Sequence, residues 1–131
     1  MSANDTQVGG LHYKSEYQHW DWVFDTDQHY LIACATKYVS RWRSKNGVED
    51  LEKSCHYLAK AQELGVQQHS PLCWPKTNLF LKGRDPWDVM VLERIMQGRL
   101  TEARMVIRSK IAYLGNEEHR AAGPDAAYVD Q

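Results

Sequence analysis

The sequence lacks the features of a membrane-spanning, exported or nucleic-acid-coating protein. The apolar run VMVL at residues 89–92, like every other apolar run in the sequence, is far shorter than the roughly 20 residues that span a bilayer. Its polar start, MSANDTQ, has no signal-peptide core. Sixteen Lys and Arg against seventeen Asp and Glu leave a net charge of -1, too little to attract duplex nucleic acid or an anionic membrane. We therefore expect a cytoplasmic protein with neither partner.

Cysteine is scarce, and its spacing predicts neither disulfides nor zinc. The three cysteines are an odd number, which is typical of reduced thiols when no export signal is present. Cys34 and Cys55 lie among apolar helical positions, where cysteine behaves as a small hydrophobe. His69 and Cys73 are spaced four residues apart, and His56 follows Cys55, but no Cys-x-x-Cys pair exists. We therefore predict no metal site.

Several signatures of enzymes are also absent. The chain has no G-x-x-x-x-G-K-[ST] phosphate loop and no nucleophile elbow with a Ser-His-Asp set. Glu49, Asp50 and Glu52 form one acidic cluster, as in the all-helical nucleotide pyrophosphohydrolases, but the second E-x-x-D of those enzymes is missing. Phosphoryl transfer rests on positioned cations and usually Mg²⁺, so this cluster is the one candidate for holding such a metal ion.

What the sequence does contain is helical periodicity. At 131 residues the chain is long enough for one domain. An aromatic-rich helix is expected at 15–24, followed by helices at 28–44 and 48–64 whose apolar residues recur every three or four positions. Asn46 and Gly47 between them form a stop signal, because glycine adopts the left-handed conformation that ends a helix. So short a connection predicts an antiparallel helical hairpin.

A second helix pair is expected to pack on this hairpin. Asp85 followed by Pro86 favours a helix start, and that helix continues to Gly98. A last helix is expected from Thr101 to Gly115. Residues 65–84 contain prolines and read as an irregular connection, with TNLFLK as a short strand or extended arm.

These elements together predict an all-α single domain. Residues 11–115 form the helical domain, with 11–64 as the hairpin region and 85–115 as the C-terminal pair. Residues 1–10 are expected to be a flexible leader and residues 116–131 a loose tail, because both are polar and lack apolar periodicity.

Two charged rows meet beside the predicted turn. Lys37, Arg41 and Lys45 recur every four residues and therefore lie on one stripe of a helix. Asp50 and Lys53 share a face of the following helix. Converging cations can hold phosphate, and the carboxylates can fix those cations or bind a divalent metal. The same stripes are also typical of an ordinary solvated helix face, and spacing alone leaves both interpretations open.

The residues of the hairpin resemble a known family. They comprise a His-Tyr pair near the start and a pattern of the form KY..R...K.G..DL.KA..YL, carried here by His12, Tyr13, Lys37, Tyr38, Arg41, Lys45, Gly47, Asp50, Leu51, Lys53, Tyr57 and Leu58. Over about residues 11–64 the chain resembles the SaV-like family of small phage proteins, described as nucleotide kinase-like. Leu11 and Ser54 depart from the family pattern, and neither departure alters a charge.

The resemblance implies a nucleotide site in a phage-encoded protein. One member of the family is a nucleoside monophosphate kinase without a Walker loop, which would need Mg²⁺. Carried over by position, Lys37, Arg41 and Lys45 would face phosphate, and His12 and Tyr13 would contact the base or sugar. The nucleotide pocket would be completed by Tyr38, Asp50 and Lys53.

A binding protein without chemistry is the alternative. A sponge that sequesters a nucleotide second messenger, and so counters host anti-phage defence, needs only basic side chains and rings on which bases stack. Tyr13, Trp20, Tyr38 and Trp42 supply such rings, although aromatic residues at helical spacing are mostly core.

The aromatic content also predicts a homo-oligomer. Five Trp, seven Tyr and two Phe, together with the apolar residues of the last two helices, exceed what so small a monomer covers, and exposed apolar patches mark interfaces. In such an assembly, Arg104 and Arg108 of one subunit could extend the anion site of another; the other interpretation is that they face water.

Overall fold

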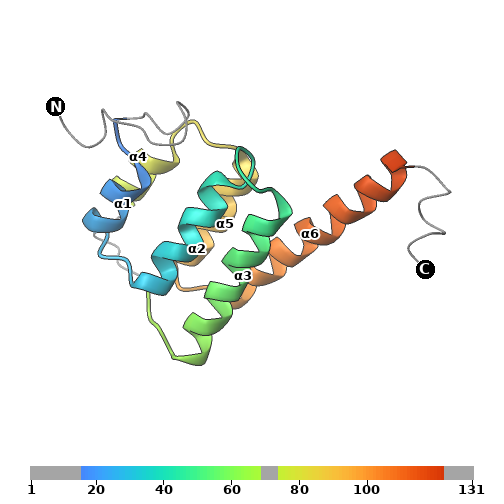
Figure 1. Ribbon diagram of the computed structural model, residues 1–131. Coiled ribbons are helices and arrows are strands. Elements are labelled where there is room, and N and C mark those ends of the chain that lie inside the picture. The colour runs from blue at the N-terminus through green and yellow to red at the C-terminus, as the bar shows by residue number, and fades with distance from the viewer. Residues whose placement is uncertain (1–15, 69–73, 123–131) are drawn as a thin grey trace.

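The structure is a computed structural model that describes residues 16–68 and 74–122, with side chains as far as residue 118. Within these ranges the chain is helical and contains no strand, which confirms the expected all-α fold (Figure 1). The helices are α1 (His19–Asp25), α2 (Tyr30–Arg41), α3 (Val48–Glu63), α4 (Trp74–Leu81), α5 (Pro86–Met96) and α6 (Leu100–Ala122).

Helices α2 and α3 form the predicted antiparallel hairpin and make the most extensive helix contact of the described chain. Gly47 precedes α3 with φ 59°, a region that residues with a Cβ rarely adopt. Its amide donates to the carbonyl of Trp42 over 2.8 Å, which closes the turn. The stop signal read from Asn46 and Gly47 is therefore confirmed.

The expected second pair, α5 and α6, packs on the hairpin through contacts of α5 with α2 and of α6 with α3. Asp85 caps α5 by accepting a hydrogen bond from the amide of Trp87 over 2.8 Å, and Pro86 occupies the first turn. Between the two pairs lies a core that is fully excluded from solvent at its centre, formed by Ile32, Ala35, Val39, Leu51, Cys55, Leu58, Ala61, Val91, Leu92, Ile95, Ala103 and Ile107.

Two sequence-based expectations are wrong, one about residues 65–84 and one about where the last helix ends. Residues 65–84 were expected to be irregular, with TNLFLK extended, but Trp74–Leu81 is a helix. Pro75 lies in its first turn, where the missing amide costs no intrahelical bond. Helix α6 does not end at Gly115 but continues to Ala122, because an interior glycine costs only about 1 kcal/mol relative to alanine. The expected leader 1–10 and residues 123–131 of the tail lie outside the described residues.

The hairpin turn is anchored to α5 by a buried carboxylate. Asp88 accepts hydrogen bonds from the Trp42 indole Nε1 over 3.0 Å and from Arg43 Nε over 3.2 Å. Arg43 also pairs with Asp85 over 3.1 Å and lies over the Trp42 ring at 4.3 Å. These contacts hold the C-terminal end of α2, which carries the basic residues, against the start of α5.

The longest described helix, α6, has 23 residues, and neither it nor any other described helix combines sufficient length with sufficient apolar character to cross a bilayer.

Candidate functional site

Three cations surround one tyrosine ring on the hairpin. Arg41 Cζ lies 4.8 Å from the centroid of the Tyr38 ring, Lys53 Nζ 5.4 Å and Lys37 Nζ 5.8 Å. All are within the range in which a cation is attracted to a ring face. Lys37 and Arg41 come from α2 and Lys53 comes from α3, so the structure brings together three residues predicted to bind phosphate or line the pocket. We call this group, with Tyr57, the Tyr38 cluster.

Tyr57 of α3 completes the cluster by stacking on Tyr38, with ring centroids 5.8 Å apart and planes at 14°. The pKa of Tyr57 is raised, chiefly by the neighbouring Cys34 thiol, so its hydroxyl stays protonated at neutral pH. The phenol therefore adds a hydrogen-bond donor to the cluster and no negative charge. Cys34 and Cys55 are both free thiols, as expected, and Cys73 lies outside the described residues.

Asp50, expected in the pocket wall, instead lies beneath the cluster. Its side chain is fully excluded from solvent, and its Oδ2 is 3.6 Å from Arg41 Nε. It also accepts hydrogen bonds from the Asn46 amide over 3.2 Å and from the Asn46 side chain over 3.4 Å. Asp50 therefore positions Arg41 and the turn and has no surface to offer a ligand.

The charge of the cluster is not balanced. Arg41 pairs with Asp50 over 3.6 Å, and Lys53 pairs with Glu49 over 3.6 Å. Lys37 is exposed and forms no ion pair with any residue that the structure describes. The positive charge of Lys37 is therefore left on the surface of the hairpin, beside the two paired cations Arg41 and Lys53.

The remaining predicted site residues are placed differently or not at all. Lys45 lies beyond the end of α2, in the turn, where it is exposed and its amide donates to the Arg41 carbonyl over 3.1 Å. It is thus near the expected stripe without being part of the helix. His12 and Tyr13 lie outside the described residues, as do His69 and Cys73 of the rejected zinc set. In the described ranges, no three His, Cys, Asp or Glu residues gather as metal ligands.

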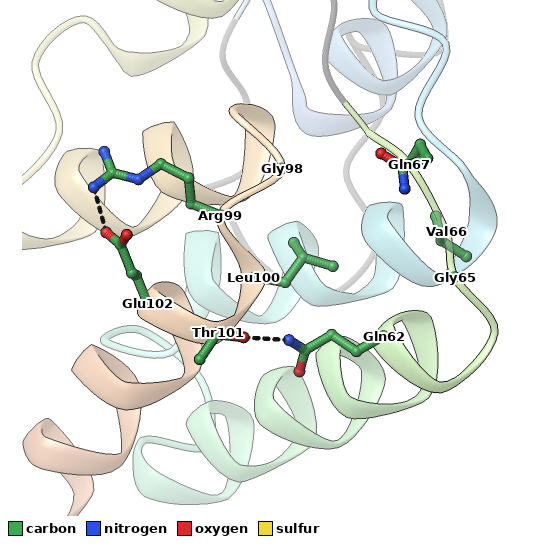
Figure 2. A pocket seen from close by; sticks show the side chains of 9 residues that line it. All are labelled: Gln62, Gly65, Val66, Gln67, Gly98, Arg99, Leu100, Thr101 and Glu102. Carbon is green, nitrogen blue, oxygen red and sulfur yellow. Dashed lines mark hydrogen bonds and ion pairs between the residues drawn. The ribbon is translucent and has the colours of Figure 1, made fainter.

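A separate pocket of about 340 Å³ lies at the far end of α3, between the segment after it and the α5–α6 turn (Figure 2). Gln62 donates to Thr101 Oγ1 over 2.7 Å and accepts from Arg104 Nη1 over 2.7 Å. Arg99 forms an ion pair with Glu102. Arg99 and Arg104 are therefore committed to contacts around this pocket, at the opposite end of α3 from Asp50.

A polar network between α1 and α2 was not predicted from the sequence. His19 Nε2 lies 2.8 Å from Thr36 Oγ1, and that hydroxyl donates to the Gln28 side chain over 2.8 Å. Burial lowers the pKa of His19 to about 3, with the charges of Arg84 and Lys37 as further causes. The imidazole is therefore neutral at physiological pH. Arg84 follows Lys37 by 47 residues, so no local pattern could have associated the two.

The lowered pKa of His19 predicts acid sensitivity. Between pH 6.5 and 3 the unfolded chain binds a proton at this site that the folded protein does not, so stability falls as the pH falls through that window. By pH 4 the loss relative to pH 7 should be on the order of 3 kcal/mol. Urea denaturation at both pH values should show it, and His19→Gln, which keeps a donor toward Thr36, should remove this component. Equal pH dependence of the two proteins would contradict the assignment.

Comparison with known proteins finds similarity in the part of the chain that contains the Tyr38 cluster. Residues 11–59 match the model of a family described as a protein of unknown function (DUF3310). No curated protein and no solved structure matches the chain. The matched segment includes α1, α2 and most of α3, and so contains all members of the Tyr38 cluster. The similarity thus covers the segment that builds the candidate site and names no activity for it.

Proposed function

We propose that this protein binds nucleotides and holds their phosphates on the Tyr38 cluster. The observation that carries the proposal is the convergence of Lys37, Arg41 and Lys53 around one ring. Among the described residues Lys37 has no counter-ion. Charge-assisted hydrogen bonds to phosphate are about twice as strong as neutral ones. The resemblance of residues 11–64 to the nucleotide kinase-like SaV-like family supports the same ligand class.

The aromatic pair favours a nucleotide over a simple anion. Tyr38 and Tyr57 stack, and clusters that combine cations with aromatic rings are typical of proteins that bind single nucleotides or single strands, because bases stack on rings without regard to sequence. His12 and Tyr13 remain predicted contacts of the base or sugar. The same proposal includes that the protein is phage-encoded and acts in the cytoplasm of the host cell.

Two activities fit such a site. A nucleoside monophosphate kinase would transfer the γ-phosphoryl group of ATP to the bound monophosphate with the help of Mg²⁺, giving ADP and a nucleoside diphosphate. A sponge would hold a nucleotide second messenger unchanged. One observation favours the sponge. The carboxylates of Asp50 and Glu49 already pair with Arg41 and Lys53, so they are not available to hold the Mg²⁺ that a kinase needs. Incubation with a monophosphate, ATP and Mg²⁺ separates the two, because only a kinase yields diphosphate.

Replacing Lys37 by alanine should weaken nucleotide binding about tenfold, since a charged hydrogen bond contributes roughly 1.5 to 3 kcal/mol. Lys37 is exposed and unpaired among the described residues, so the melting temperature should not change. Arg99→Ala, which removes an exposed cation at the opposite end of α3 from the cluster, is the matched control and should bind normally. Calorimetry with mono-, di- and triphosphates of the common nucleosides is the measurement. Unchanged affinity for Lys37→Ala would contradict the site assignment.

The predicted homo-oligomer belongs to this proposal. Met105 and Tyr113 of α6 are 64% and 57% exposed, and the C-terminal half of α6 extends away from the other helices (Figure 1). Exposed apolar side chains on an extended helix favour contact with a second copy. Light scattering should give a mass above the 15.2 kDa of one chain; a mass near that value would contradict the oligomer.

A further inference from the structure

Arg84 is a partly buried cation that contacts an aromatic ring and two backbone carbonyls of the described chain. It lies in the loop between α4 and α5, with its Cζ 4.0 Å from the centroid of the Phe80 ring. Its Nε donates to the Phe80 carbonyl over 3.0 Å, and its Nη1 donates to the Ser40 carbonyl over 3.3 Å. The carboxylate that acts on it through space, Asp88, is bonded to Arg43 instead. Within the described ranges Arg84 therefore has no ion-pair partner.

Lys37 lies three residues before the point at which Arg84 contacts α2. The carbonyl that accepts from Arg84 belongs to Ser40, and residues three apart are neighbours on a helix surface. Both cations also act on His19, whose pKa they help to lower. At the same time, Lys37 Nζ is 5.8 Å from the Tyr38 ring. Lys37 therefore belongs to the Tyr38 cluster and lies about one helical turn from the carbonyl that Arg84 binds.

The local electrostatics favour an anion between these two cations. Burial lowers the pKa of Arg84, and Asp88, which opposes that shift through space, is itself bonded to Arg43. Lys37, which has no ion-pair partner in the described part of the chain, adds a second positive charge. His19 contributes no charge, because it is neutral at physiological pH. A guanidinium that offers free donors beside an ammonium is well suited to phosphate oxygens.

We propose that the ligand of the Tyr38 cluster carries at least two linked phosphoryl groups, and that Arg84 together with Lys37 binds the second of them. This inference rests on the proposed nucleotide binding and specifies its ligand class. Arg41 and Lys53 hold the first phosphoryl group, Lys37 bridges the two, and Arg84 holds the group farther from Tyr38. Because one flexible lysine serves both positions, the arrangement suits phosphoryl groups that share a bridging oxygen, as in a nucleoside diphosphate.

The test compares mono- and diphosphates of each common nucleoside by calorimetry without Mg²⁺. The full-length protein should bind the diphosphate at least tenfold more tightly than the monophosphate, as one additional charged contact implies. Arg84→Gln should weaken diphosphate binding about tenfold and change monophosphate binding less than twofold. Arg84→Lys keeps the charge and should retain most of the preference. Arg99→Gln, at an exposed arginine that precedes α6, is the control and should leave both affinities unchanged.

Each outcome separates this inference from the proposed function. If the wild-type protein binds neither ligand of any pair, the proposed nucleotide binding is wrong. If it binds both with equal affinity, only the second phosphoryl site is wrong, whether or not Arg84→Gln folds. If Arg84→Gln lowers the melting temperature and weakens both ligands equally, Arg84 has a structural role alone and the inference is overturned.

Discussion

Replacing Asp50 by alanine is expected to destabilise the protein by about 3 to 5 kcal/mol, the usual cost of breaking a buried ion pair by removing one partner. The Asp50 carboxylate is fully buried and joins Arg41 to the amide and side chain of Asn46. Arg41 Nε is buried and makes no hydrogen bond in the described structure. Loss of the Asp50 carboxylate would also leave it without its counter-ion. The turn would also lose two hydrogen bonds. Urea denaturation at neutral pH measures the change.

The neighbouring Glu49 supplies the matched control. Its side chain is 64% exposed, and it pairs with Lys53 over 3.6 Å, so Glu49→Ala should cost at most about 1 kcal/mol. If the two variants were equally stable, Asp50 would not be the anchor of the hairpin turn. Asp50→Ala should also bind nucleotides less tightly, because Arg41 would no longer be held over Tyr38.

A loss of similar size, about 3 to 5 kcal/mol, is expected for Trp22→Ala. Trp22 has no exposed surface and stacks on Phe80, with ring centroids 4.3 Å apart and planes at 8°. Its indole Nε1 donates to Thr77 Oγ1 over 3.0 Å. These contacts join α1 to α4, so the variant should lose the packing of both short helices in addition to the volume of one side chain.

Phe24 of the same helix is the control for Trp22. It is 85% exposed, so Phe24→Ala should change the free energy of unfolding by about 0.5 kcal/mol or less. Thermal denaturation followed by circular dichroism compares the two variants. A wild-type melting temperature for Trp22→Ala would contradict the assignment of α1 and α4 to the cooperative fold.

The sequence alone predicted the hairpin and the start of α5 because the signals that define them are local. Helical periodicity, the left-handed conformation of Gly47 and the cap at Asp85 each depend on residues within about four positions of one another. The spacing of Lys37 and Arg41 likewise placed them on one stripe. That Lys53 would approach the same ring followed from the antiparallel pairing of two helices joined by a short turn.

Tertiary contacts decided the features that local signals left open. In the sequence, Asp50 is simply a negative residue in the first turn of a helix, where the helix dipole favours it. Only its burial beside Arg41 in the structure shows that it supports the site without lining it. The irregular composition of 65–84 concealed α4, whose buried Thr77 and Phe80 face Trp22 of α1. Short helices of this kind form when a distant surface covers their apolar side, since their own propensity is insufficient.

The extent of the candidate site also depended on the tertiary structure. Sequence spacing identified cations on α2 and α3, yet Arg84 reaches Ser40 from the α4–α5 loop, 44 positions along the chain. Such proximity arises from how helices pack, and packing depends on side-chain volumes throughout the core. The sequence by itself therefore determined the helices and the basic stripe, whereas the tertiary structure decided which charges are buried, which are paired and which remain to meet an anion.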